Sequence, residues 1–355
     1  MSILFSPLTI AGTMFRNRLW VSPMCQYSAV DGVPQEWHHV HLAQFASGGA
    51  GLVVVEATAV SPGGRISPED TGIWTDAQQE AWAPIVAAIR SRGAVAGIQL
   101  AHAGRKASTS SPFSGHRGSV PHERGGWQTV APSAVAFDGY ATPSALDHAG
   151  IDHVVANFAA AARRAVAAGF TVLEVHAAHG YLLHEFLSPL SNPRTDEYGG
   201  SFENRTRLLR RVVTAVREAA PAAVLAVRFS ATDWADGGWS VDDTVRAAAE
   251  VRAQGVDLVD VSSGGLVAHQ RITTGPGYQV SFAAAVHAAV DVPVNAVGMI
   301  DDAALAEEIL VRGDADAIMA GREWLRDPHF ALRAAHELGG DVPWPPQYER
   351  AAPRR

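Results

Sequence analysis

Cysteine is almost absent from the chain, and its scarcity excludes several classes of site. Cys25 is the only cysteine among 355 residues. A single thiol cannot form a disulfide within the chain, a zinc site built on several cysteines or a cysteine-ligated iron–sulfur cluster. Because such scarcity is typical of proteins kept in a reducing compartment, we expect a cytoplasmic protein.

Strong positive charge, long apolar runs and nucleotide-binding motifs are also missing. The formal net charge is −8, which argues against a broad surface for nucleic acid or anionic membranes. No stretch approaches the roughly 20 apolar residues of a membrane span. Residues 1–7 have neither a basic nor a long apolar region, so we expect no signal peptide. No G-x-x-x-x-G-K-[ST] occurs and no G-x-G-x-x-G follows a strand-like run, so a Rossmann module is not expected.

Lysine is as scarce as cysteine. Lys106 is the only one, and all other strongly basic residues are arginine. A compact ammonium group near the end of a strand-like run has two interpretations. It is the nucleophile of a Schiff-base aldolase or of another phosphate-binding barrel enzyme, or it is a solvated loop lysine. The residues alone do not choose between them.

Eight short apolar runs rich in β-branched residues recur along the chain. They span residues 19–24, 52–60, 95–101, 172–175, 225–229, 258–261, 292–297 and 317–320. Their near-continuous apolar character is typical of parallel strands that are covered on both faces. We therefore expect eight buried parallel strands.

The segments between the runs have helical features. Residues 82–89 and 209–216 repeat apolar side chains at helical spacing, and residues 75–78 and 240–243 resemble capping boxes. Strands that alternate with helices predict an α/β fold with a parallel sheet. Eight is the number of strands that closes a (β/α)8 TIM barrel, which we predict; a doubly wound open sheet is the alternative.

No change of composition and no linker divides the chain, so we predict one domain over residues 1–355. Residues 1–18 precede the first strand and are expected to form an N-terminal cap or a small hairpin.

Residues 108–147 form a long loop after the third strand that is rich in Ser, Pro and Gly. Long loops at the carboxyl ends of barrel strands lie on the catalytic face, so this segment is a candidate lid; a disordered insertion is the alternative.

Reactive side chains gather where the strand-like runs end, which is the edge that carries the active site in barrel enzymes. They are Gln99 near the end of the third run, His176, His179 and Tyr181 after the fourth, Arg228 at the fifth, Gly298 after the seventh, and Gly321 and Arg322 after the eighth. Glycines and an arginine near the last two strands match the recurrent phosphate site of barrels. The alternative is that these glycines only make tight turns.

The pair His176 and His179 suggests either a metal site or hydrogen bonding. Neither Cys nor a carboxylate stands beside the pair at ligand spacing, and the pair follows a strand rather than lying on a helix. Two adjacent imidazoles are well suited to donate hydrogen bonds to an oxyanion or a carbonyl oxygen. We therefore predict no metal site.

Several strings of residues together resemble the Old Yellow Enzyme family. They are Ser-Pro-Met-Cys-Gln-Tyr-Ser at 22–28, His-Ala-Ala-His-Gly-Tyr-Leu at 176–182, Ser-Asn-Pro-Arg-Thr-Asp-Glu-Tyr-Gly-Gly-Ser at 191–201, Val-Gly-Met-Ile at 297–300 and Gly-Arg-Glu at 321–323. Cys25, Tyr27, His179 and the ending Gln-Tyr-Glu-Arg at 347–350 resemble its bacterial, thermophilic-like branch. The resemblance runs from about Phe5 to Arg350.

This resemblance implies a non-covalently bound FMN and NADPH as the reductant of the flavin. The positions that match the family's flavin-binding residues are Ser22, Pro23, Met24, Cys25, Ala57, Gln99, Arg228, Gly298, Gly321 and Arg322. Cys25 would tune the flavin's potential, with a buried structural cysteine as the alternative. Arg228 would place positive charge near the N1–C2 region of the ring. Arg322 would bind the phosphate, in agreement with the argument from the barrel.

The resemblance also implies reduction of the C=C bond of α,β-unsaturated carbonyl compounds. His176 and His179 would hold the substrate's carbonyl oxygen, and flavin N5 would give a hydride to the β-carbon. Tyr181 would give the proton to the α-carbon, and Tyr27 would line the substrate pocket. A phenol with an ordinary pKa near 10 is a protonated donor at neutral pH. The alternative for Tyr181 is an aromatic side chain packed at the strand end.

Arg350 matches an arginine of the same branch that reaches the active site of a neighbouring subunit. The resemblance therefore implies a homodimer or a dimer-based homotetramer, whose partners are otherwise only NAD(P)H and a small enone-type substrate. A charged tail residue without such a role is the alternative. A third class of function is a barrel that binds flavin or another ligand without catalysis.

Overall fold

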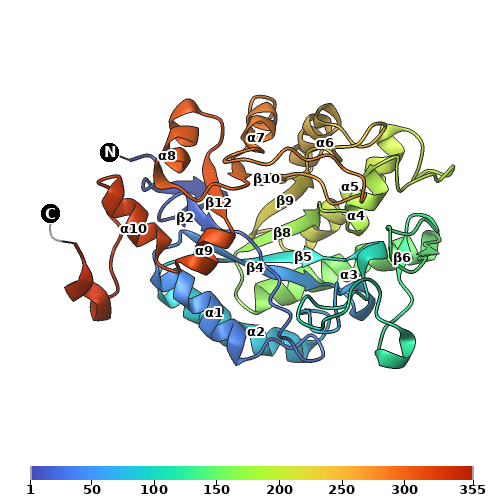
Figure 1. The fold of residues 1–355 in the computed structure, drawn as a ribbon, viewed down its shortest axis with the longest axis horizontal. Helices are drawn as coiled ribbons and strands as arrows, with labels where there is room; N and C mark the ends of the chain where they lie inside the picture. The colour runs from blue at the N-terminus through green and yellow to red at the C-terminus, as the bar shows by residue number, and fades with distance from the viewer. Residues whose placement is uncertain (1, 354–355) are drawn as a thin grey trace.

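Eight parallel strands closed into a barrel form the centre of the computed structural model, which describes residues 2–353 (Figure 1). The strands are β3 (Leu19–Val21), β4 (Leu52–Ala59), β5 (Val95–Ala101), β8 (Val172–Ala177), β9 (Val224–Ser230), β10 (Leu258–Ser262), β11 (Val294–Val297) and β12 (Ala317–Ala320). Each strand pairs with the next along the chain, and β12 pairs with β3 to close the ring. The predicted (β/α)8 barrel is confirmed, and the open sheet is excluded.

Helices surround the barrel and separate consecutive strands. They are α1 (Glu36–Ser47), α2 (Asp76–Ser91), α3 (His148–Ala167), α4 (Leu182–Leu187), α5 (Phe202–Ala219), α6 (Val241–Ala253), α7 (Val280–His287), α8 (Ala303–Arg312), α9 (Arg322–Arg326) and α10 (Phe330–Glu337). The capping boxes predicted before α2 and α6 are present, with Thr75 and Ser240 as the capping residues. The apolar stripes predicted in α2 and α5 are buried against the barrel.

The N-terminal segment forms the expected hairpin. β1 (Leu8–Ile10) and β2 (Thr13–Phe15) pair antiparallel around a two-residue turn in which Ala11 and Gly12 both have positive φ. A tight turn of this kind matches the twist of the two strands. Ile10 and Phe15 of the hairpin belong to one buried cluster with residues at the beginnings of the barrel strands, such as Leu52, Val172 and Leu258. The hairpin therefore covers the amino-terminal end of the barrel and leaves the opposite end for the active site.

The long segment after β5 has a defined path beside the carboxyl-terminal rim. It contains a 3-10 turn at His122–Arg124 and a short parallel pair, β6 (Val130–Ala131) with β7 (Ser144–Ala145). Trp127 attaches it to the β4–α2 connection: its Nε1 donates to Gly63 O at 3.0 Å, and the Arg65 guanidinium lies 4.8 Å from its ring centroid. The segment is thus an ordered structure at the rim, as a lid would be.

None of the helices within residues 2–353 combines the length and the apolar character that a membrane-spanning helix needs.

Candidate active site

The carboxyl ends of the barrel strands bring together nearly all residues predicted to act at the site. Strand geometry explains this, because parallel strands all end at the same rim. Ser22, Ala57, Gln99, His176 and Arg228 are buried there, with exposed fractions between 2% and 5%. Pro23, Met24, Cys25, Tyr27, His179 and Tyr181 are part-buried in the segments that leave β3 and β8. Gly298, Gly321 and Arg322 follow β11 and β12.

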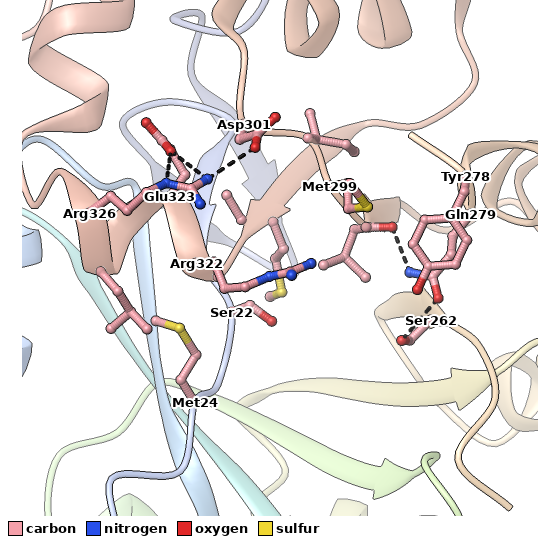
Figure 2. Close-up of a pocket in the computed structure, with 17 residues that line it drawn as sticks. Ser22, Met24, Ser262, Tyr278, Gln279, Met299, Asp301, Arg322, Glu323 and Arg326 are labelled. Carbon is pink, nitrogen blue, oxygen red and sulfur yellow. Dashed lines mark hydrogen bonds and ion pairs between the residues drawn. The ribbon is translucent and has the colours of Figure 1, made fainter. Parts of the chain in front are cut away.

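A cavity of about 410 Å³ lies at this rim between the ends of β3, β10, β11 and β12. Five of the residues expected to bind FMN line it, namely Ser22, Met24, Gly298, Gly321 and Arg322. Figure 2 shows the Arg322 guanidinium extending into the middle of the cavity, away from the ion pairs of Arg326 at the upper left. Arg322, which follows the last strand, thus places a positive charge inside the cavity.

The cavity fits a flavin phosphate. Nearby Arg326 is paired with Glu323 at 2.9 Å and with Asp301 at 3.0 Å, whereas Arg322 has no carboxylate within 4 Å among residues 2–353 (Figure 2). Gly298 has a φ of +123°, and a Cβ added there would lie 2.6 Å from the Gln279 amide nitrogen. An unpaired guanidinium suits a bound phosphate dianion, and the packing of Gln279 leaves no room for a side chain at Gly298.

Gln279 is a structural residue of this cavity that sequence reasoning did not single out. It directly precedes α7 and is 2% exposed. Its Nε2 donates to Val297 O at 2.8 Å, and its Oε1 accepts from the Ser263 hydroxyl at 2.6 Å. Gln279 therefore joins the ends of β10 and β11 at the cavity wall (Figure 2). Gln279 follows Gly-Pro-Gly-Tyr in a loop, and this local sequence does not indicate a role at the site. The only available signal was its position immediately before a helix.

His176, His179 and Tyr181 form a compact group next to the cavity, since Nε2 of His179 lies 2.8 Å from the hydroxyl of Ser262 in the cavity wall. The ring centroids of His176 and His179 are 5.1 Å apart, and those of His176 and Tyr181 are 5.2 Å apart. Burial lowers the pKa of both imidazoles well below the ordinary value, and the positive charges of Arg228 and Lys106 lower both further. Both side chains are therefore neutral at pH 7. Nδ1 of His176 is buried without a hydrogen-bond partner in the described part of the chain, as expected of a group that a ligand satisfies.

The backbone between the two histidines and the tyrosine is tightly held. His179 and Gly180 both have left-handed conformations, with φ of +60° and +70°. The His179 amide donates to the Ser230 hydroxyl at 2.9 Å, and its carbonyl accepts from Lys106 Nζ at 2.9 Å. The Gly180 amide donates to Nδ1 of the buried His184 at 2.9 Å. Side chains from three other parts of the chain thus fix the turn that carries the reactive groups.

A buried cluster of charges lies inside the barrel below the rim. Arg228 pairs with Asp260 at 3.0 Å and donates to the Ser22 hydroxyl at 3.2 Å. Gln99 donates to Glu174 at 2.7 Å. Burial raises the pKa of Glu174 and of Asp260, and the neighbouring Asp260 carboxylate raises that of Glu174 further. Since one guanidinium serves two buried carboxyl groups, one of the two holds a proton at neutral pH.

Cys25 and Tyr27 lie on the side of the rim formed by β3 and β4. Burial raises the pKa of the Cys25 thiol well above its usual value, and the carboxyl groups of Asp70 and Glu56 raise it further. Cys25 is therefore a neutral thiol, which is poorly suited to nucleophilic attack. The Tyr27 ring contacts Phe113 of the long loop edge-on, with centroids 5.9 Å apart. The loop thus reaches the expected substrate side of the rim.

Lys106 is occupied by contacts that do not favour the Schiff-base interpretation. Its Nζ donates to the carbonyl oxygens of His179 and Gly265 at 2.9 and 3.0 Å. It also lies 5.1 Å from the ring centroid of Tyr181 and 4.9 Å from that of Phe137. An amine that is enclosed by two carbonyls and two rings is poorly placed to attack a substrate carbonyl.

Arg350 is the one predicted site residue that the chain does not bring to the rim. It is exposed in the 3-10 turn Pro346–Ala351, which projects from the barrel on the side opposite the segment with β6 (Figure 1). The expected contact with a neighbouring subunit stays a prediction.

Within residues 2–353, one trio of possible metal ligands places its ligand atoms within 4.8 Å of one another: His148, Asp196 and Glu197.

Comparison with known proteins gives the family. The model of the NADH:flavin oxidoreductase / NADH oxidase family matches residues 3–340. NADPH dehydrogenase of Bacillus subtilis strain 168 is 47% identical over 350 residues, which cover 98% of each chain. The structure of morphinone reductase in complex with tetrahydroNAD is 29% identical, with a TM-score of 0.79 over 97% of this chain and 93% of that one. The old yellow enzyme homologue from Zymomonas mobilis is 29% identical, with a TM-score of 0.79 over 99% of both chains.

These similarities extend over nearly the whole chain, and the cavity at the rim contains an arginine without a carboxylate partner among the described residues. The chain therefore belongs to the NADH:flavin oxidoreductase / NADH oxidase family, that of the Old Yellow Enzymes, and is an FMN-dependent oxidoreductase.

Proposed function

We propose that this oxidoreductase takes electrons from NADPH and reduces the C=C bond of α,β-unsaturated carbonyl compounds. The observation that carries the proposal is the grouping of two neutral imidazoles and one phenol at the rim, beside a cavity with an unpaired arginine. The similar Bacillus protein is an NADPH dehydrogenase, and the similar morphinone reductase was solved with tetrahydroNAD, which supports the choice of a nicotinamide reductant.

The FMN would be held by the residues that line the cavity and its edge. Arg322, Gly321 and Gly298 would bind the phosphate end, and Ser22, Pro23 and Met24 would lie along the molecule. Cys25, Ala57, Gln99 and Arg228 would surround the ring, with Arg228 as the positive charge beside its pyrimidine edge. When bound, FMN accepts two electrons from NADPH and supplies them to the acceptor.

His176 and His179 would bind and polarise the acceptor's carbonyl group. A neutral imidazole has one N–H, which donates a hydrogen bond to the oxygen without transferring its proton. Because burial and the nearby cations keep both rings neutral, the pair acts as fixed donors in a site of low polarity. Two such donors withdraw electron density from the conjugated system and make its β-carbon the electron-poor position.

Tyr181 would supply the proton that completes the reduction. Burial raises the pKa of its phenol well above 10, so the hydroxyl is protonated at neutral pH. Its ring lies against His176, which places the phenol next to the group that holds the carbonyl. The O–H bond of Tyr181 breaks as a C–H bond forms at the α-carbon, and the phenolate then takes a proton from water. Tyr27 and the long loop at 108–147 would bound the substrate on the other side.

We further propose that NADPH and the acceptor use this rim in turn, since the sequence has no separate dinucleotide motif. Residues 1–355 would act as one FMN-binding domain in the cytoplasm. The exposed 3-10 turn with Arg350 would reach a neighbouring subunit in a homodimer or a dimer-based homotetramer.

The test uses the purified, FMN-saturated protein without oxygen. NADPH should remove the visible absorbance of the flavin, and cyclohexenone should restore it with formation of cyclohexanone. Tyr181→Phe should leave the first step unchanged and slow the second by about 100-fold or more, because a positioned general acid is lost. Tyr198→Phe is the matched control, because its hydroxyl accepts a hydrogen bond from Arg211 of α5 rather than lying at the rim, and it should change neither step.

A protein that is reduced by NADPH but never reoxidised by any enone would refute the choice of acceptor. Equal slowing of both steps in Tyr181→Phe would remove that residue from its assigned role.

A further inference from the structure

Lys106 lies closer to the reactive turn than any role assigned so far requires. It is the only lysine of the chain and belongs to the 3-10 turn Gly104–Lys106 after β5. Its ammonium group donates to the carbonyls of His179 and Gly265, which belong to the loops that follow β8 and β10. No carboxylate of residues 2–353 lies within 4 Å of it; nearby Glu185 instead accepts the backbone N–H of Arg105 at 2.8 Å.

The remaining side of the ammonium group faces two aromatic rings. Nζ lies 5.1 Å from the centroid of Tyr181 and 4.9 Å from that of Phe137, so it is enclosed between the proposed acid and the long loop. A cation within about 6 Å of an aromatic ring is attracted to its face, and the attraction grows when the ring becomes an anion. The location of Lys106 therefore favours the ionised form of Tyr181.

The phenol at position 181 needs such a partner. Burial makes loss of its proton unfavourable, and the nearby groups Cys25, Tyr27 and Asp70 raise its pKa further. A phenol that cannot tolerate negative charge is a protonated group but a weak acid. The group therefore requires a nearby positive charge at the moment when the proton leaves.

We propose that Lys106 is a positioning residue for proton transfer: its ammonium group holds the 179–181 turn by two carbonyl hydrogen bonds and stabilises the phenolate that Tyr181 becomes. The inference rests on the proposed function, in which Tyr181 gives its proton to the α-carbon. The electron pair of the broken O–H bond stays on the phenolate, whose ring centroid lies 5.1 Å from Nζ of Lys106. Protonation of the phenolate by water restores the starting state.

The neighbouring Arg105 offers a matched control. It too ties the rim loops together, donating to Leu266 O at 2.7 Å and to Val135 O at 3.1 Å. Its guanidinium contacts the Phe137 ring at 5.8 Å, and no contact with the Tyr181 ring accompanies it among the described residues. Loss of Arg105 therefore tests the effect of loosening the loops without removing the charge next to Tyr181.

The experiment places a fluorinated tyrosine at position 181 and follows its ionisation by fluorine NMR in the resting, FMN-saturated protein. The fluorinated phenol is more acidic than tyrosine, which brings its titration into an accessible range. Burial lowers the pKa of Lys106 to about 8, so the tyrosine must carry enough fluorine to titrate below pH 8, where the ammonium group is charged. In that range Lys106→Met should raise the phenol's pKa by about two pH units, as expected for the loss of a charge about 5 Å from the ring centroid in a medium of effective dielectric constant near 20. Lys106→Arg should restore most of the shift, and Arg105→Met should cause none.

Lys106→Gln keeps N–H donors but has no charge, so it separates the effect of the charge from that of the hydrogen bonds. It also replaces the methionine variant if that variant does not fold. It should give the same upward shift and slow reoxidation by cyclohexenone about 10-fold or more, while reduction by NADPH is unchanged. An unchanged titration in both neutral variants, with Tyr181→Phe still slow, would overturn the role of Lys106 and leave the proposed function intact. A Tyr181→Phe variant with normal reoxidation would instead overturn the proposed function.

Discussion

Replacing His184 with phenylalanine should destabilise the protein strongly, although the residue touches no expected ligand. His184 is fully buried in α4. Its Nδ1 accepts the Gly180 N–H, and its Nε2 lies 2.8 Å from Asp233 Oδ1. The other oxygen of Asp233 accepts from the Ser188 hydroxyl at 2.6 Å and from Trp239 N at 2.7 Å. The imidazole thus connects the reactive turn to a buried carboxylate.

The size of the effect follows from the two groups that lose their partner. A buried backbone N–H without an acceptor costs about 1–3 kcal/mol, and a buried carboxylate that loses its imidazole partner costs about as much or more. Burial alone would raise the pKa of Asp233, but His184, Ser188 and Trp239 outweigh it and keep the pKa below its usual value. Phenylalanine fills most of the space, so the cavity contribution is small. The expected loss is about 3–6 kcal/mol, a large part of the roughly 5–15 kcal/mol typical of a folded domain.

Urea unfolding at a fixed FMN concentration measures this loss as a shift of the midpoint. The matched control is His148→Phe, which changes a histidine that also contacts carboxylates but has 58% of its side chain exposed. That variant should lose less than about 1 kcal/mol. Among molecules that remain folded, His184→Phe should also raise the KM for cyclohexenone, since the Gly180 amide between His179 and Tyr181 is released. A loss below about 1 kcal/mol would refute the reasoning.

Three further results are expected. Gly180→Ala should lower the melting temperature and impair reoxidation by an enone, because the added Cβ would lie 2.2 Å from the backbone oxygen of Gly265 at a φ of +70°; an unchanged melting curve would contradict this. Arg322→Met should weaken FMN binding about 10- to 100-fold in a flavin fluorescence titration, as expected when a charge-assisted hydrogen bond is lost, whereas the already paired Arg326→Met should bind FMN nearly normally. Burial raises the pKa of Asp70 to about 7, so the folded state binds more protons than the unfolded state from about pH 4 to pH 7. The stabilisation from Asp70 is therefore lost as the pH rises through 7, by at most about 1.4 kcal/mol per pH unit, and Asp70→Asn should show a flatter decline of urea stability between pH 5 and pH 8.

The sequence by itself determined the architecture and the main chemical groups of the rim. Apolar runs such as 95–101 and 317–320 became barrel strands because a nearly continuous apolar segment is stable only where both faces are covered. Capping boxes at 75–78 and 240–243 marked two helix starts, since the signals that begin a helix are local. The His-Ala-Ala-His-Gly-Tyr string could be located at a strand end for the same reason.

Only the tertiary structure decided which polar groups support those residues. His184 contacts Asp233 from 49 positions away along the chain, and Lys106 contacts Gly265 across a separation of 159 residues. Gln279 joins two strand ends that its local sequence does not identify. Such contacts depend on how separate loops meet at the rim of a closed barrel, and local periodicity has no information about that meeting.

The same distinction applies to charge. Composition showed that Lys106 is unique, but its two interpretations could be weighed only when its ammonium was found between two carbonyls and two rings. Likewise, nothing in the sequence indicates that Glu174 and Asp260 share one arginine inside the barrel, where burial raises the pKa of both. Protonation depends on burial and on the nearest charges, and both are fixed by the folded chain rather than by the order of its residues.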